Sequence, residues 1–328
     1  MGLRRLEPGV ITYNAAITAC EKGNQWQAAL RILADMQMNH LEPDVITYSA
    51  AISACEKGSQ SQRALRIFSG MSRRGAEPNA VSCSAAISSC EKAAQWQDAL
   101  ALLSDKSLGM ELHVIAFNAA ISACENSANW AEALSIVADM RHKRLELDVV
   151  TYSAAVSSCE KGAQVKAALD LFSSISMLKL EANHIAYNAA ICACGEGVQW
   201  QEALNMLSDM VLRRVEPSVL DYNAVISACG KGSQGQRAVG LLSVMRQPPL
   251  KPDDITYTTA ITACERGSLY REAQTLLSDM RQQRWEPDAL AYSTVISACD
   301  VGIQWHAAFS LISDMRARSL EPDGIIPP

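Results

Sequence analysis

Apolar side chains recur along the chain with the spacing of one face of an α-helix, inside a unit of 35 residues that is clearest at residues 45–79. The first half of this unit has apolar side chains three or four residues apart, at Val45, Tyr48, Ile52 and Cys55. Such spacing places the four side chains on one stripe of a helix, where they pack against neighbouring elements. No segment shows the alternation of apolar and polar residues that is typical of a strand. We therefore expect an all-α fold.

The residues that flank the apolar stripe predict two helices in each unit. Asp44 stands where an N-cap residue accepts hydrogen bonds from the free amides of the first helical turn. Gly58 ends this first helix, and Ser59 is placed to cap a second helix that runs to about Arg73. Two helices of about three to four turns, joined by a short loop, form an antiparallel helical hairpin.

The unit is repeated nine times. The copies occupy residues 10–44, 45–79, 80–113, 114–148, 149–183, 184–218, 219–253, 254–288 and 289–323. Residues 1–9 resemble the end of a preceding copy, and residues 324–328 form a C-terminal tail. Self-similarity at this period predicts a solenoid, in which each repeat contacts only its neighbours. We therefore expect a single solenoid over residues 10–323.

A second stripe on the first helix changes along its length from aliphatic to small polar to cationic, and it recurs in every copy. The second residue of each copy is aliphatic: Ile11, Ile46, Val81, Ile115, Val150, Ile185, Leu220, Ile255 and Leu290. The fifth is Asn, Ser or Thr: Asn14, Ser49, Ser84, Asn118, Ser153, Asn188, Asn223, Thr258 and Ser293. The thirteenth is basic in six copies: Lys22, Lys57, Lys92, Lys161, Lys231 and Arg266. The last residues are Asp44, Asn79, His113, Asp148, Asn183, Ser218, Asp253, Asp288 and Asp323. A core face has no need of such a gradient, so we expect the second, fifth and thirteenth positions to form a functional row, called the ladder below, along one surface.

The unit carries a family resemblance in its (V/I)TYN opening, its central A-L, its D-M near the end of the second helix and its closing EPD. In these features it resembles the pentatricopeptide repeat, over nearly the whole chain. The resemblance implies a right-handed superhelical solenoid of about nine helix-turn-helix repeats, in an array of the P type. The tetratricopeptide repeat is the nearest alternative, but its W-x2-L-G-x2-Y pattern is absent from the sequence.

The resemblance also implies sequence-specific binding of single-stranded RNA, with about one base read by each repeat. In that scheme the aliphatic second residue lies between adjacent bases, the fifth and last residues contact the base edge, and the cation meets the phosphate. Asn at the fifth position reaches a small pyrimidine, whereas Ser or Thr leaves room for a purine. A last residue of Asp goes with U or G, and Asn or Ser goes with A or C. Applied in order, the pairs imply a target near 5′-UANUACUGG-3′, with the third base unassigned because of His113.

Other interpretations of the ladder stay open. Asp, Asn and Ser are good N-caps, Ser, Asn and Thr near a helix start bond to the backbone, and helix C-termini favour cations for electrostatic reasons. The same concave surface could instead bind a peptide, which would make the protein a scaffold for protein–protein interactions. Capping alone does not explain why the fifth residue is restricted to three types in nine copies, so we favour base contact.

Composition narrows the class of function. At a net charge of −6, the chain gains little from neutralising phosphates without sequence preference, so we expect base contacts to dominate and the salt dependence to be modest. The sequence has no phosphate-cradling glycine motif, metal-ligand cluster or Ser/His/Asp set. We therefore expect no enzymatic activity, no cofactor and no metal. No apolar run is long enough for a membrane span.

The expected state is a monomer that binds single-stranded RNA and RNA-processing or editing proteins. The sequence shows no targeting segment; a mitochondrial or chloroplast location is implied by the family resemblance alone.

Cysteine and tryptophan follow the repeat as well. Nine of the eleven cysteines stand at the eleventh position of a copy, where we expect small buried apolar side chains rather than ligands or disulfides. Free thiols in turn indicate a reducing compartment. One position near the start of the second helix holds five tryptophans: Trp26, Trp96, Trp130, Trp200 and Trp305. We expect these indoles to pack between copies rather than to stack on bases.

Overall fold

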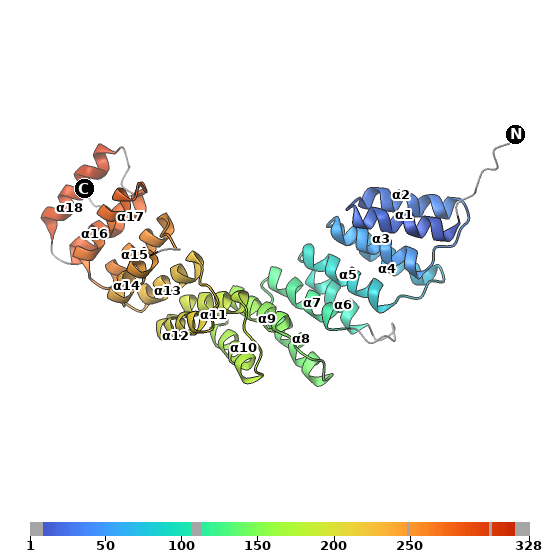
Figure 1. Cartoon of the computed structure of the whole chain (residues 1–328). Coiled ribbons are helices and arrows are strands. Elements are labelled where there is room, and N and C mark those ends of the chain that lie inside the picture. Colours follow the sequence, from blue (N-terminus) through green and yellow to red (C-terminus); the bar gives the residue numbers. More distant parts are fainter. Residues whose placement is uncertain (1–8, 106–112, 248–249, 302–303, 319–328) are drawn as a thin grey trace. The chain divides into compact units, whose positions relative to one another are not determined.

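Helices in pairs make up the fold. The computed structural model describes residues 9–105, 113–247, 250–301 and 304–318, and within these ranges it holds eighteen α-helices and no strand (Figure 1). The all-α prediction is confirmed. Residues Met1–Gly162 form one compact unit and Ala163–Pro328 another.

The first unit holds nine of the described helices. They are α1 (Val10–Lys22), α2 (Trp26–Met38), α3 (Val45–Lys57), α4 (Ser61–Arg73), α5 (Ala80–Lys92), α6 (Trp96–Ser104), α7 (Val114–Asn126), α8 (Trp130–His142) and α9 (Val149–Lys161). The described part of the second unit holds the others. They are α10 (Val165–Met177), α11 (His184–Glu196), α12 (Trp200–Leu212), α13 (Val219–Lys231), α14 (Gly235–Met245), α15 (Asp254–Arg266), α16 (Tyr270–Gln282), α17 (Ala289–Val301) and α18 (Trp305–Ala317).

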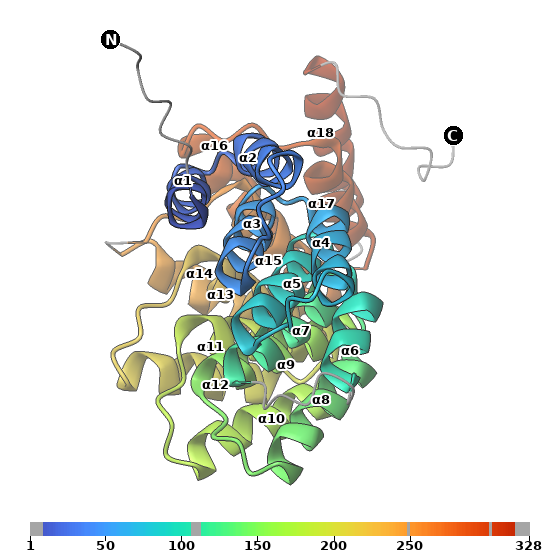
Figure 2. The same cartoon turned by 90° about the vertical axis from the view of Figure 1, so that its right-hand side faces the viewer.

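The odd-numbered helices are the first helices of the repeats, and within each unit they pack in a row. In the first unit α1, α3, α5, α7 and α9 contact one another in sequence, and each also contacts the second helices beside it. Figure 2 shows α2, α4, α6 and α8 on one side of this row. In the second unit α11, α13, α15 and α17 pack in the same way. The single solenoid expected over residues 10–323, whose last residues lie outside the described ranges, stays a prediction.

The last residue of a repeat starts the first helix of the next. The Asp44 carboxylate accepts from the Thr47 amide at 2.8 Å, and the Thr47 hydroxyl accepts from the Asp44 amide at 3.2 Å. These two bonds form a capping box, which satisfies two amides that a helix start leaves without partners. The predicted N-cap role of Asp44 is confirmed. The same side-chain cap is made by Asn79, Asp148, Asn183, Ser218, Asp253 and Asp288.

The second helix starts differently from the prediction. Ser59 was expected to cap it, and this expectation is wrong. Ser59 has a φ of +54° and α4 begins only at Ser61, without a side-chain cap. The Gln60 amide donates to the Cys55 carbonyl at 2.9 Å, which satisfies an orphan carbonyl at the end of the first helix. Ser59 therefore serves to close the first helix, in the left-handed conformation that closure requires.

Glycine follows the first helix because the preceding repeat comes close there. A Cβ atom at Gly58 would lie 2.2 Å from Cδ1 of Trp26, although the φ of Gly58 is an ordinary −84°. Gly162 meets Trp130 and Gly232 meets Trp200 in the same way, each at 2.3 Å. For Trp26, Trp130 and Trp200 the predicted packing between copies is confirmed.

The core of each unit combines aromatic, aliphatic and thiol side chains on the inner stripe of the first helices with apolar side chains of the second helices, such as Met36 and Phe68. Tyr48, Ile52 and Cys55 are at most 2% exposed, as the apolar stripe predicts, whereas Val45 is only partly buried. All cysteines in the described residues are free thiols, and burial raises the pKa of the Cys55 thiol to about 11. These thiols act as small apolar groups and not as nucleophiles.

Within the described residues, each helix is too short or too polar to cross a membrane.

Candidate functional site

Aliphatic side chains line the outer face of the first helices in both units. The nine second-position residues are between 54% and 86% exposed, from Val150 to Ile11. The side chains two residues further along are buried, as the 2% exposure of Tyr48 illustrates. Isolated exposed aliphatic residues are ordinary on a protein surface, but one at the same position in every repeat is a regular series. Such a series presents apolar edges at the period of the repeat.

Beside these aliphatic residues, the fifth-position Asn of a repeat is bonded to the last residue of the same repeat. The Asn14 amide nitrogen donates to both carboxylate oxygens of Asp44, at 3.2 and 3.1 Å. Asn118 donates to Asp148 at 3.4 Å. Asn223 donates to Asp253 at 3.5 Å. The structure thus brings together the two residues that the sequence assigns to base contact in copies one, four and seven.

A third residue, from the next repeat, completes this cluster. The Thr47 hydroxyl contacts the carbonyl oxygen of Asn14 and lies 2.8 Å from Asp44. In copy four the Thr151 hydroxyl donates to the Asn118 carbonyl oxygen at 2.6 Å. Both Thr47 and Thr151 are the third residue of the following copy and are fully buried. Each cluster therefore belongs to two consecutive repeats.

These contacts keep the carboxylates ionised. Burial alone would raise the pKa of Asp44, but hydrogen bonds from the Thr47 amide and hydroxyl and from the Asn14 amide outweigh it, so the pKa is lowered below its ordinary value. The same balance lowers the pKa of Asp148 and of Asp253. Each of these three repeats thus presents a fixed negative charge beside its Asn.

Serine and threonine at the fifth position bond back to their own helix. The Ser49 hydroxyl donates to the Val45 carbonyl at 2.7 Å, and Ser153 donates to Val149 at 2.6 Å. Thr258 donates to the Asp254 carbonyl at 2.9 Å. These are the backbone bonds that the structural interpretation of the ladder foresees. They also draw the short side chain towards the helix, which leaves more space in front of it than an Asn leaves.

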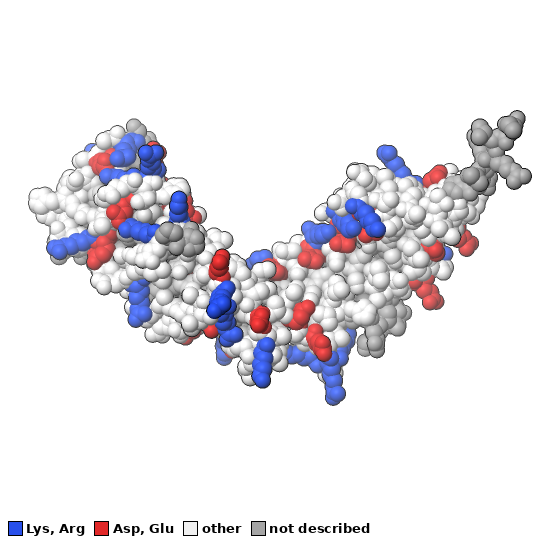
Figure 3. All heavy atoms as spheres, viewed as in Figure 1, with Lys and Arg blue, Asp and Glu red and all other residues white. Residues whose placement is uncertain are grey.

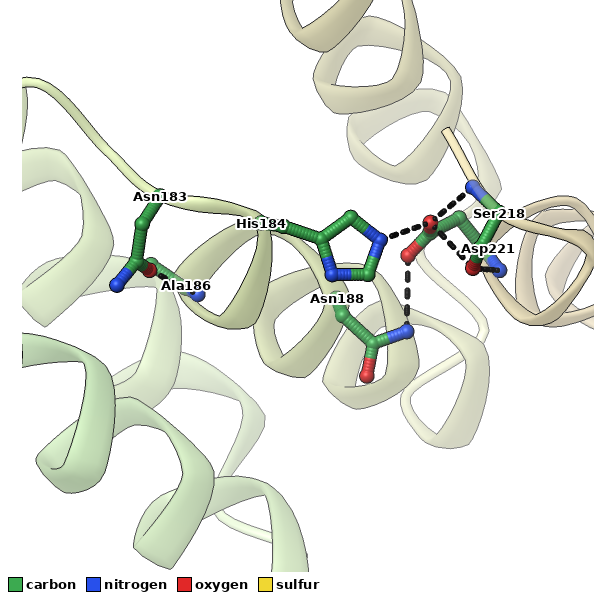
Figure 4. Close-up of polar contacts among 6 residues, drawn as sticks. All are labelled: Asn183, His184, Ala186, Asn188, Ser218 and Asp221. Carbon is green, nitrogen blue, oxygen red and sulfur yellow. Dashed lines mark hydrogen bonds and ion pairs between the residues drawn. The ribbon is translucent and has the colours of Figure 1, made fainter. Parts of the chain in front are cut away.

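Copy six has a different cluster, shown in Figure 4. The third residue of the following copy is here Asp221, whose side chain is fully buried. The Asn188 amide nitrogen donates to Asp221 Oδ1 at 2.8 Å. Asp221 Oδ2 accepts from the Ser218 amide at 2.7 Å and from the Ser218 hydroxyl at 2.8 Å. His184 Nε2 lies 3.0 Å from the same oxygen.

Four of the six ladder cations are paired with the twelfth or thirteenth residue of the preceding copy. Lys57 bonds to Glu21 at 3.0 Å. The other pairs are Lys92 with Glu56, Lys161 with Glu125, and Lys231 with Glu196. In the described residues, Lys22 and Arg266 form no ion pair. These four glutamates thus bridge consecutive repeats.

Copy four has Asn126 at the thirteenth position, where most copies have a cation. The Asn126 side-chain amide donates to the backbone carbonyl of Glu91, in the preceding copy, at 3.1 Å. Burial raises the pKa of the Glu91 carboxyl, nearby Lys92 opposes the rise, and the carboxylates of Glu56 and Glu125 add to it.

In the second unit an aliphatic residue, a fifth-position residue and two cations of the ladder line one shallow hollow. It is lined by Lys231 from α13, Thr258 and Arg266 from α15, and Leu290 from α17. The hollow thus places an aliphatic edge, a fifth-position hydroxyl and two cations around one space. On the visible face of both units, by contrast, positive and negative side chains are interspersed (Figure 3).

Some predicted site residues have no cluster. His113 makes no side-chain cap, in keeping with its departure from the pattern, and Asp323 lies outside the described residues. Within the described residues there is no group of three His, Cys, Asp or Glu that could hold a metal ion.

The sequence interpretation overlooked the third position of the repeats. Its signal is Asp221, an acid where the other copies have Thr, Ser or Ala.

Family models match most of the chain. The model described as pentatricopeptide repeat domain matches residues 103–162, 170–232 and 241–301, together more than half of the 328 residues. The PPR repeat family model matches residues 8–57, and the PPR repeat model matches residues 46–75 and 221–247. No curated protein matches the chain.

Among solved structures, the chain is similar to the pentatricopeptide repeat protein PPR10 from maize. The identity is 18% and the TM-score 0.51, over 98% of this chain and 55% of the maize chain. A structure of PPR10 in complex with an 18-nucleotide psaJ RNA element has 19% identity and a TM-score of 0.49, over 96% of this chain and 56% of that one. The PPR domain of protein-only RNase P 1 from Arabidopsis thaliana, in complex with tRNA, has 12% identity and a TM-score of 0.45, over 52% of this chain and 89% of that one.

This chain thus spans just over half the length of PPR10. The paired helices, the repeated N-caps and the family models agree, and the chain belongs to the pentatricopeptide repeat family.

Proposed function

We propose that this protein binds single-stranded RNA in a sequence-specific manner, with one base read by each repeat. Proteins of this family read RNA bases with two or three side chains per repeat. The observation that carries the proposal is the regular row of exposed aliphatic side chains, 54% to 86% exposed, beside the fifth-position residues. An apolar edge at every repeat can lie between successive bases, because each base has an apolar face.

The fifth and last residues of each repeat, which lie beside the exposed aliphatic side chains, distinguish one base from another. Copies one, four and seven offer an Asn amide held by an Asp carboxylate, and we assign U to them. Ser49, Ser153 and Thr258 are drawn back onto their helices, which supports the assignment of purines to their copies. The proposed target is 5′-UANUACUGG-3′, with the third base unassigned.

The phosphates would be met by the ladder cations, two of which line the hollow in the second unit. Four of the six cations are already paired with glutamates, so each must exchange a carboxylate for a phosphate. Base contacts would therefore supply most of the affinity, at about 1 to 3 kcal/mol for each stacked base.

The biological role that follows is that of an adaptor, acting by occupancy in the processing, stabilisation, editing or translation of an organellar transcript. Family membership supports this role and a mitochondrial or chloroplast location. An adaptor of this kind works as a monomer and recruits RNA-processing or editing proteins.

A reciprocal recoding of two neighbouring repeats tests the proposal. Asn223 and Thr258 are the fifth residues of copies seven and eight, and both copies end in Asp. Asn223→Thr should change the preferred seventh base from U to G, and Thr258→Asn should change the eighth from G to U. Fluorescence anisotropy with labelled nonamers that differ only at these bases measures both changes, with an expected effect of about tenfold per base.

The double variant is the matched control, because it exchanges the two side chains without changing the composition. It should prefer G at base seven and U at base eight. Unaltered preferences in all three variants would contradict the proposal. Equal binding of unrelated RNAs, or no retention on any RNA, would instead favour a peptide as the ligand of this surface.

A further inference from the structure

In copy six, the Asn amide is held differently from the Asn amides of copies one and four. In copies one and four the Asn donates to the last residue of its own repeat, and its carbonyl oxygen accepts from a Thr hydroxyl of the next repeat. Both ends of those amides therefore have protein partners. In copy six the last residue is Ser218, and the carboxylate is supplied by Asp221 of the next repeat.

This exchange leaves the carbonyl end of the amide accessible, whereas the Asn223 carbonyl oxygen of copy seven, which also has no partner among the described residues, is buried. The Asn188 nitrogen is bound to Asp221, and Figure 4 shows the Asn188 carbonyl oxygen on the side away from Asp221. Among the described residues, this oxygen has no hydrogen-bond partner and is not counted among the buried side-chain atoms that lack one. Because a carboxylate only accepts hydrogen bonds, Asp221 requires the nitrogen to face it. The amide orientation is thus fixed, with an acceptor left for a ligand.

The neighbouring hydroxyl presents one further lone pair. Ser218 donates its hydroxyl proton to Asp221 Oδ2 at 2.8 Å and accepts from the Asp221 amide at 3.4 Å, so its oxygen has one lone pair and no proton left for a ligand. Besides the second N–H of Asn188, copy six therefore offers two acceptors, which are the carbonyl oxygen of Asn188 and one lone pair of Ser218. An exocyclic amino group matches two acceptors, whereas a carbonyl oxygen is repelled by them.

We propose that Asp221 is a positioning residue that makes copy six select cytosine against uracil, by directing the carbonyl oxygen of Asn188 and the remaining lone pair of Ser218 towards the amino group of the base. The proposal deepens and rests on the proposed RNA binding. It assigns a specificity role to the third residue of the following repeat, outside the residues that face the base. The buried Asp221 touches no base; it acts through Asn188 and Ser218.

The test compares the wild type with Asp221→Thr. Thr at this position is found in copies two, five and eight, where it forms part of the N-cap and is fully buried, so the variant keeps a native-like helix start. Its hydroxyl would donate to the Asn188 carbonyl oxygen, as Thr47 and Thr151 contact Asn14 and Asn118. The preference for 5′-UAAUACUGG-3′ over 5′-UAAUAUUGG-3′ should fall by about tenfold, the effect of one hydrogen bond.

A merely structural role would lower binding to both RNAs alike. The readout is therefore the ratio of the two dissociation constants, together with the preference for U over G at base seven as an internal control. An unchanged C-to-U ratio in Asp221→Thr, with the base-seven preference intact, overturns this proposal and leaves the proposed function standing. Absence of base preference at every position of the wild type overturns both.

A transplant into copy one keeps the proposal testable if Asp221→Thr fails to fold. Asp44→Ser alone creates the Asn and Ser pair of copy six without its buried carboxylate. Asp44→Ser with Thr47→Asp adds that carboxylate. The double variant should prefer C over U at base one about tenfold more strongly than the single variant. Equal ratios in the two variants would overturn the proposal.

Discussion

At the scale of single residues, the last residue of each repeat has two tasks. Asp44 caps a helix and holds the amide of Asn14. Helix capping and base recognition are therefore not competing explanations, because one carboxylate does both. An Ala at this position would remove both functions at once and would separate neither.

The acid sensitivity of the fold should reveal the caps. The pKa values of Asp44, Asp148 and Asp253 are lowered in the folded protein. Their contribution to stability is thus fully present above the unfolded-state pKa of about 3.9 and is lost as the pH falls through the folded pKa values. Between pH 5 and pH 3, the wild type should lose more thermal stability than the triple variant Asp44→Asn, Asp148→Asn, Asp253→Asn.

Asn caps a helix as Asp does but does not titrate, as Asn79 and Asn183 show in this chain. Melting followed by circular dichroism at the two pH values gives the comparison. Equal losses in both proteins would show that the three carboxylates have no linked protonation.

At the scale of helices, contacts between consecutive repeats decide which residues end a helix. The left-handed conformation after the first helix falls on Asn24, Ser59 and their counterparts, and not on the residue before them, which is Gly23 and Gly58 in these two copies. Gly58 is required because the indole of Trp26 occupies the space of a side chain. The sequence of a single repeat suggests instead that the glycine adopts the left-handed conformation, since Gly is the residue that usually does so.

Two Gly→Ala substitutions in neighbouring elements should have opposite effects. Gly58→Ala places a methyl group against Trp26 and should destabilise the protein by about 1 to 3 kcal/mol. Gly70→Ala, inside α4 with open space around its Cβ position, should stabilise it by about 0.5 to 1 kcal/mol. Chemical denaturation of both variants measures the two effects. A neutral Gly58→Ala would show that Trp26 moves aside at no cost.

The sequence was sufficient to predict the helical hairpins, the buried Tyr48 and Cys55 and the N-cap role of Asp44, because these follow from spacing and local hydrogen bonding. It was insufficient for the start of α4 and for the third position. Ser59 looks like an N-cap from its side chain alone, and Thr47 looks like an ordinary helical residue. Their roles depend on which atoms of the adjoining repeat or helix end lie within 3 Å, and one copy of the pattern does not contain that information.

At the scale of the whole molecule, acidic side chains moderate the charge of the ladder. Glu21, Glu56 and Glu125 each neutralise a cation of the next repeat. Exposed ion pairs of this kind contribute little to stability. Their consequence is electrostatic. The net charge of −6 and the pairing of the lysines with glutamates weaken binding to RNA without sequence preference. Base contacts therefore contribute a larger share of the total affinity.

Removal of these carboxylates should raise the affinity for RNA and lower its sequence specificity. The triple variant Glu21→Gln, Glu56→Gln, Glu125→Gln releases Lys57, Lys92 and Lys161. Binding to any single-stranded RNA should become tighter, and the slope of log K against log salt should steepen by up to about 2 if all three lysines gain a phosphate. Titrations at several salt concentrations give the slope.

The control is Glu42→Gln, Glu77→Gln, Glu146→Gln, which changes the net charge equally at exposed residues that, within the described part of the chain, form no ion pair with a ladder cation. It should leave the slope nearly unaltered. The same slope change in both triple variants would mean that overall charge, and not release of the paired lysines, controls binding.

The bond between Thr47 and Asn14 has a consequence for how such chains can be rebuilt or rearranged. A segment exchanged between Asp44 and Val45, where one copy ends and the next begins, would separate a recognition side chain from the hydroxyl that holds it. A junction placed after Thr47 would carry the cluster across intact. The segment to transplant should therefore begin and end three residues later than the 35-residue repeat defined from the sequence. In libraries assembled from such segments, each repeat should keep its base preference in a new array.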